Sequence, residues 1–115
     1  MKLKLDHSFT KHLPKDPNTS NTRRQVLKAS YSLVNPRVPS NPRLIHISEE
    51  MIKEIGLSTD DIQSLEFLNT FSGASIYPGT TPYALNYGGH QFGHWSGQLG
   101  DGRAINIAEV INKGK

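Results

Sequence analysis

The pattern of hydrophobic and polar residues divides the chain into an irregular first part and a more regular second part. From residue 6 to residue 41, prolines fall among Asn, Ser and Thr, which favour turns over continuous helices or strands. We therefore expect a mostly irregular, extended segment. Five apolar residues are expected to anchor it on a larger body: Val26, Leu27, Tyr31, Leu33 and Val34. The apolar run at residues 43–47 then suits a short β-strand.

Residues 48–69 carry the start and stop signals of two short helices. Ser48 is an N-cap candidate followed by two acidic residues, and Gly56 supplies a stop for the first helix. Ser58 and Asp61 have the spacing of a capping box, which predicts a second helix to about residue 69. The acidic residues at both starts are explained by the helix dipole, which favours negative charge in the first turn, better than as catalytic pairs.

The next region predicts a third helix and then a hairpin. Thr81 before Pro82 resembles a cap with proline at the first helical position, which predicts a helix over residues 83–87 that ends at the following glycines. The Asp-Gly pair at 101–102 is a tight-turn signal, so residues 95–99 are expected to pair with a strand at 103–110. Residues 112–115 predict the next turn. Short helices followed by strands indicate an α+β chain.

The segment from residue 87 to residue 103 concentrates six glycines and ends in an arginine. Glycine lets the backbone approach a ligand closely, and arginine meets an anion with a planar fork of donors. Gly97, Gly100 and Gly102 have a spacing that suits a hairpin covering phosphate groups. The segment is neither a Walker A loop nor a dinucleotide-binding fingerprint, because no Gly-Lys-Ser/Thr follows and a strand comes next. The spacing alone leaves nucleotide binding and a purely structural hairpin open.

Other chemistry in this region receives a structural interpretation. His90 and His94 have the spacing of zinc ligands on a helix, but the glycines around them argue against a helix. We therefore interpret both as structural histidines. The aromatic residues are interpreted as packing residues rather than as a base-stacking platform: Tyr83, Tyr87, Phe92 and Trp95.

Composition narrows the class of protein. The net charge of +3 is mildly basic without a dense patch, and the aromatics lie mainly in the less basic half, which argues against nucleic acid as a partner. The chain has no cysteine, which excludes disulfides and thiolate metal sites within these residues. It also lacks a run of about 20 apolar residues and a secretory signal pattern. We expect a monomeric, cytoplasmic protein with no membrane partner, a mitochondrial location staying open for a eukaryotic source.

The chain is also expected to be incomplete as a domain. Hydrophobic residues make up only 35% of it, and seven prolines and ten glycines interrupt the pattern, so a large self-sufficient core is not expected. The predicted strand at 103–110 would leave an open edge, which natural domains rarely tolerate. These features favour a fragment of a longer protein.

Specific motifs cover nearly the whole chain: Asp6-His-Ser-Phe, Leu13-Pro-x-Asp-Pro17, Tyr31-Ser-Leu-Val-x-Pro36, Asn41-Pro-Arg-Leu44, Glu54-Ile-Gly-Leu57, Phe71-Ser-Gly73, Tyr87-x-Gly-His-Gln-Phe-Gly93 and Gly97-Gln-Leu-Gly-Asp-Gly-Arg-Ala-Ile105. On these motifs the chain resembles the N-terminal part of the selenoprotein O family, the protein adenylyltransferases with a pseudokinase fold. The resemblance implies a kinase-like fold, with an extended N-terminal segment at 1–42 and the truncated start of the nucleotide-binding lobe at 43–115.

The resemblance also implies a site and a reaction. Gly100, Asp101, Gly102 and Arg103 would belong to the ATP site, and AMP would pass from ATP to Ser, Thr or Tyr hydroxyls of protein substrates. Mg²⁺ or Mn²⁺ would be held by a later lobe. In the family the catalytic residues and the metal ligands come after this part, so none is expected within this chain and the chain alone is expected to be inactive. Two alternatives stay open: a non-catalytic nucleotide-binding or interaction remnant, and a structural fragment without an independent fold.

Overall fold

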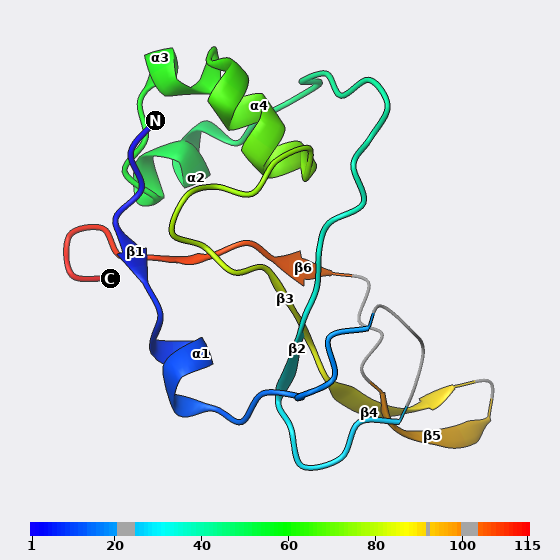
Figure 1. Cartoon of the computed structure of the whole chain (residues 1–115). Coiled ribbons are helices and arrows are strands. Elements are labelled where there is room, and N and C mark those ends of the chain that lie inside the picture. The colour runs from blue at the N-terminus through cyan, green and yellow to red at the C-terminus, as the bar shows by residue number, and fades with distance from the viewer. Residues whose placement is uncertain (21–24, 92, 100–103) are drawn as a thin grey trace. The chain divides into compact units, whose positions relative to one another are not determined.

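The computed structural model describes residues 1–20, 25–91, 93–99 and 104–115, and these form two compact units. The first unit combines Met1–Asp6, Pro36–Thr80 and Ile107–Lys115, and the second combines His7–Asn35 and Thr81–Asn106. Both contain short elements only, and the chain is α+β, as its pattern predicts (Figure 1).

The first unit contains three short helices, α2 (Glu49–Glu54), α3 (Thr59–Ile62) and α4 (Leu65–Ser72). The predicted start of α2 is confirmed, because the Ser48 hydroxyl accepts a hydrogen bond from the Met51 N–H at 3.3 Å. The predicted capping box is confirmed too. The Asp61 N–H donates to Ser58 Oγ at 3.3 Å, and the Ser58 N–H donates to Asp61 Oδ2 at 2.8 Å.

The single helix expected from Ser58 to about residue 69 is wrong, because it is divided into α3 and α4. Ser64 begins a new helix there, since its hydroxyl accepts a hydrogen bond from the Phe67 N–H at 3.1 Å. Each of the three helices is therefore capped by a serine: Ser48, Ser58 and Ser64. Gly73 ends the last one in the left-handed region, with φ at +82°.

Residues near the two ends of the chain complete the first unit. Strand β1 (Leu5–Asp6) pairs antiparallel with β7 (Glu109–Val110), so that Leu5 lies opposite Val110. The turn expected at residues 112–115 is confirmed by reciprocal backbone hydrogen bonds between Asn112 and Lys115, at 2.9 and 3.0 Å. From this turn the Asn112 side-chain amide donates to the carbonyls of Lys53 and Glu54, at 3.1 and 3.0 Å. These carbonyls lie at the end of α2, where the helix itself supplies no N–H donors.

A small core holds the first unit together. Leu3, Leu57 and Phe67 are buried, and apolar residues from α2 and β7 pack around them.

Residues 43–47, expected as a strand, are irregular instead, so that prediction is wrong. A strand needs a partner for its backbone hydrogen bonds, and the apolar pattern says nothing about whether a partner is present.

The Met1 ammonium group lies beside two carboxylates of the helical region. It is 3.3 Å from Glu66 Oε1 and 3.3 Å from Asp61 Oδ1. Hydrogen bonds to these carboxylates, that to Glu66 first, raise the pKa of the Met1 ammonium. The hydrogen bond from the Ser58 N–H is the main cause that lowers the pKa of the Asp61 carboxyl.

The second unit is built around a three-stranded antiparallel sheet and one short helix, α1 (Ser8–His12). The sheet order is β2 (Tyr31–Leu33), β3 (Tyr83–Leu85) and β6 (Ile105–Asn106). The described residues of 6–41 are mostly irregular, as expected, but α1 and β2 were not predicted. Of the five predicted anchors, Val26 and Tyr31 are buried, whereas Leu27 is 72% exposed and anchors nothing.

The helix expected over residues 83–87 is wrong, because residues 83–85 form β3 and Tyr87 begins the next strand. Tyr83 and Ala84 are buried in the sheet. The Tyr83 ring stacks on Phe9 at 5.2 Å and meets Tyr31 edge to face at 5.3 Å between centroids. Burial against partners more than 50 residues away in sequence outweighs the local Thr-Pro start signal.

The strand pairing expected for residues 95–99 and 103–110 is also wrong. The described residues of the second segment divide into β6, which pairs with β3, and β7, which pairs with β1. Residues 95–99 belong instead to β5 (His94–Leu99), which pairs with the preceding strand β4 (Tyr87–Gln91). Each strand takes a partner that the adjacent turn signal did not specify.

Candidate functional site

The glycine-rich segment forms an antiparallel hairpin in the second unit. Strand β4 (Tyr87–Gln91) pairs with β5 (His94–Leu99), with Gln91 opposite His94 near the turn and Tyr87 opposite Leu99 at the far end. Gly93 lies in the turn with φ at +81°, a conformation that favours glycine. An added Cβ at Gly93 would meet nothing within 4 Å, so the backbone faces open space there.

The hairpin is irregular at its centre. Gly88 pairs with Gln98 and His90 pairs with Trp95, so Gly89 stands opposite two residues, Ser96 and Gly97. An extra residue on one strand is a β-bulge, which bends the strand and is common beside binding and active sites. The glycines therefore serve a turn and a bulge in one hairpin.

The predicted ATP-site residues Gly100, Asp101, Gly102 and Arg103 lie outside the described residues. The chain on either side of them is described. On one side, Leu99 lies opposite Tyr87 in β4. On the other side, Ile105 lies opposite Ala84 in β3, the strand just before β4. The structure thus brings both flanks of the predicted site to adjacent positions along β3 and β4.

The histidines and aromatics of this region divide into different roles. His90 and His94 lie on the two strands of the hairpin, so the expectation that they do not share a helix is confirmed. Tyr83 is a packing residue as predicted. Trp95 is 62% exposed, so it does not belong to the buried core of this chain, while Phe92 lies outside the described residues.

A buried polar cluster fixes the point where β3 passes into β4, and the sequence did not reveal it. Asn86, between the two strands, donates from its backbone N–H to the Ser30 carbonyl at 3.0 Å and from its side-chain amide to the Ala29 carbonyl at 3.3 Å. The Ser32 hydroxyl donates to Asn86 Oδ1 at 3.0 Å and lies 3.3 Å from Asp16 Oδ2. Ser32 and Asp16 are buried. This network ties the start of the hairpin to β2.

The cluster carried no local signal, because its members lie far apart in sequence. Ser32 and Asn86 are 54 residues apart, and their residue types are common in turns. Only the pairing of β2 with β3 brings them together.

Among the described residues, no group of three or more His, Cys, Asp or Glu side chains is placed to hold a metal ion. None of the helices in those ranges is long and apolar enough to cross a membrane.

Comparison with known proteins identifies the family. Residues 17–115 match the family model described as Protein adenylyltransferase SelO. The chain belongs to the SelO family. Its glycine-rich hairpin lies inside the matched range, and the family resemblance noted from the sequence motifs is confirmed.

Individual bacterial relatives of this SelO chain bear the name Protein nucleotidyltransferase YdiU. One from Flavobacterium johnsoniae is 57% identical over 110 residues, and one from Methylobacillus flagellatus is 49% identical over 111 residues. A third, from Xanthomonas campestris pv. campestris, is 46% identical over 109 residues. These matches cover 95 to 96% of this chain and 21% of each relative. The chain thus spans about a fifth of the length of these relatives.

Proposed function

We propose that this chain supplies the glycine-rich part of the ATP site in a full-length SelO protein adenylyltransferase. That enzyme transfers AMP from ATP to Ser, Thr or Tyr hydroxyls of protein substrates. The observation that carries the proposal is the bulged β4–β5 hairpin within a sequence that matches the SelO family over residues 17–115. The names of the relatives, protein nucleotidyltransferases, support the reaction class.

The proposed contacts with ATP lie at Gly100, Asp101, Gly102 and Arg103. Backbone N–H groups in a glycine-rich turn approach phosphate oxygens closely because no Cβ intervenes, and the Arg103 guanidinium adds a bidentate cationic partner. The open face at Gly93 and the bulge at Gly97 fit a hairpin whose backbone lies against a ligand. The partly buried Ser32–Asn86 hydrogen bond would then hold the base of this hairpin in place.

The remaining parts of the reaction belong to the rest of the protein in this proposal. A divalent cation, Mg²⁺ or Mn²⁺, held by later residues would neutralise charge on the phosphates during transfer. Catalysis of nucleotidyl transfer depends on such positioning and charge stabilisation, so the isolated chain is proposed to be inactive. The fold is proposed to be the start of a kinase-like lobe at residues 43–115, preceded by an extended segment at 1–42, in a cytoplasmic protein.

The test uses a full-length polypeptide in which this chain replaces the matching 110 residues of the Flavobacterium johnsoniae relative. Incubation with α-labelled ATP, Mg²⁺ and candidate protein substrates should label protein with AMP. Arg103→Ala should weaken ATP binding about tenfold, the effect of losing one charge-assisted contact of about 1.4 kcal/mol. Arg37→Ala, at an exposed arginine of the other unit, is the matched control and should leave ATP binding unchanged.

The outcomes separate the proposed enzyme from its alternative. ATP binding without any AMP labelling would favour a non-catalytic nucleotide-binding module. Equal ATP affinity in the Arg103→Ala and control proteins would remove Arg103 from the site. No ATP binding by the full-length polypeptide would contradict the proposal as a whole.

A further inference from the structure

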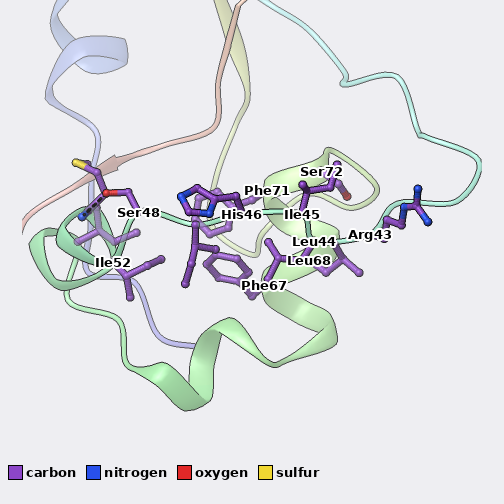
Figure 2. A pocket seen from close by; sticks show the side chains of 13 residues that line it. Arg43, Leu44, Ile45, His46, Ser48, Ile52, Phe67, Leu68, Phe71 and Ser72 are labelled. Carbon is purple, nitrogen blue, oxygen red and sulfur yellow. Dashed lines mark hydrogen bonds between the residues drawn. The ribbon is translucent and has the colours of Figure 1, made fainter.

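The first unit carries an apolar groove of about 650 Å³, bordered by residues 43–48 and by helices α2 and α4. Figure 2 shows Phe67, Leu68 and Phe71 of α4 along the groove, with Arg43 at one end and Ile52 of α2 at the other. Large apolar side chains on its border are exposed to solvent. Met51 is 55% exposed and Phe71 is 43% exposed. A contiguous exposed apolar surface of this kind is typical of an interaction site.

The extended border of the groove is unusual in its backbone as well as in its side chains. Within the described part of the chain, residues 43–47 make no backbone hydrogen bonds. Ile45 is 89% exposed and Leu44 is 49% exposed. A second hollow, of about 590 Å³, lies along residues 44–50. The segment therefore presents free backbone donors and acceptors together with strand-forming apolar side chains, which is the arrangement that an added strand recognises.

The length of the relatives indicates where a segment that fills the groove comes from. The chain corresponds to 21% of each relative, so in a full-length protein about four fifths of the polypeptide is joined covalently to it. A segment on the same polypeptide binds the groove intramolecularly, at an effective concentration that does not fall when the protein is diluted, unlike the concentration of a second molecule. An intramolecular occupant is therefore favoured over a second copy.

We propose that residues 43–47 are a strand-docking site for an apolar, extended segment from the remaining four fifths of the full-length SelO polypeptide. The added segment hydrogen-bonds to the backbone of residues 43–47, and its side chains fill the groove against α2 and α4. Ile45, exposed in this chain, becomes buried in the full-length protein. The proposal depends on family membership and is independent of the adenylyltransferase reaction.

Thiol labelling in the full-length polypeptide described above tests the side-chain burial. Ile45→Cys places a thiol on the docking segment, and Val38→Cys places one at a position that is 66% exposed, on the same connection but outside the groove. With a maleimide reagent, the Ile45→Cys protein is expected to react at least 100-fold more slowly than the Val38→Cys protein. Both should react at similar rates in denaturant.

Hydrogen exchange tests the backbone pairing. In the full-length polypeptide, the amides of residues 44–47 are followed by peptide mass spectrometry. Alternate amides of this segment face an added strand, and their exchange should be slowed at least 100-fold relative to unstructured peptide, because each paired amide must open before it exchanges.

Each contrary result identifies what is wrong. Equal labelling rates in the Ile45→Cys and Val38→Cys proteins would overturn the docking site. Slow labelling of the Ile45→Cys protein with unprotected amides would overturn strand addition, because an occupant would then contact side chains only. Protection that disappears on dilution of the protein would identify a second copy as the occupant and would overturn the intramolecular proposal.

Discussion

The two units differ in how far apart in sequence the residues that build them lie. In the first unit each helix starts at a serine that bonds an N–H three residues later, as Ser48 and Ser64 do. In the second unit every strand of the central sheet depends on a distant partner, such as Tyr31 opposite Leu85. Local signals therefore predicted two of the three helix starts in the first unit, at Ser48 and Ser58, whereas no local signal predicted the strand pairing of the sheet.

This comparison predicts that long-range packing contributes most to the stability of the second unit. Tyr83→Ala removes a buried ring that stacks on Phe9 and meets Tyr31, and it should lower the free energy of unfolding by about 4 kcal/mol. Denaturant unfolding monitored by circular dichroism measures this loss. Leu27→Ala, at a residue of the same unit that is 72% exposed, is the control and should change stability little. Equal losses in both variants would contradict the placement of the aromatic cluster.

The polar cluster that anchors the hairpin should contribute the next largest effect. Ser32→Ala leaves Asn86 Oδ1 without its donor in a partly buried site, which should cost about 1 to 2 kcal/mol. Because Asn86 joins β3 to β4, the amides of the hairpin should also exchange faster with solvent. Ser40→Ala, at an exposed serine, provides the control. Unchanged exchange in the hairpin would mean that the Ser32 hydroxyl does not position it.

The contrast also explains which parts of the fold and site the sequence could predict. Ser58 and Asp61 sit three residues apart, so their pairing could be read directly, but the new cap at Ser64 was hidden inside an apolar pattern that continues across it. The Thr-Pro signal at residues 81–82 predicted a helix that does not form. Tyr83 is instead buried by residues far away in sequence, and no local pattern indicates that burial. For the site, the family was predicted from the motifs. The hairpin that forms pairs β4 with β5 instead of residues 95–99 with 103–110, and the Ser32–Asn86 contact needed the sheet.

In the first unit a matched pair of glycines separates steric contact from backbone strain. Gly73 and Gly114 both have positive φ, +82° and +77°, so alanine is strained at each by about 1 kcal/mol. Only at Gly73 would the new Cβ meet another residue, Pro36 Cβ at 2.9 Å. Gly73→Ala should therefore destabilise the chain by about 1 kcal/mol more than Gly114→Ala in denaturant unfolding. Equal effects would show that Pro36 moves aside freely.

The smallest effect concerns the capping box and depends on pH. Hydrogen bonds from Ser58, first from its N–H, lower the pKa of the Asp61 carboxyl below its ordinary value of 3.8. A carboxyl whose pKa is lowered by folding stabilises the folded state at pH values above its ordinary pKa. That contribution is lost as the pH falls below 3.8 and through the pKa of the folded state.

Asp61→Asn should therefore lower the melting temperature slightly at neutral pH and remove part of the stability loss seen on acidification. Melting curves between about pH 6 and pH 2 measure both changes, since this range spans the ordinary carboxyl pKa. Asp60→Asn is the matched control, because it removes the neighbouring first-turn carboxylate and leaves the Ser58–Asp61 pair intact. If both variants shift the acid limb of the curve equally, the effect arises from first-turn charge in general. A shift confined to Asp61→Asn assigns it to the contacts of Asp61 itself, which are the capping box with Ser58 and the ion pair with the Met1 ammonium.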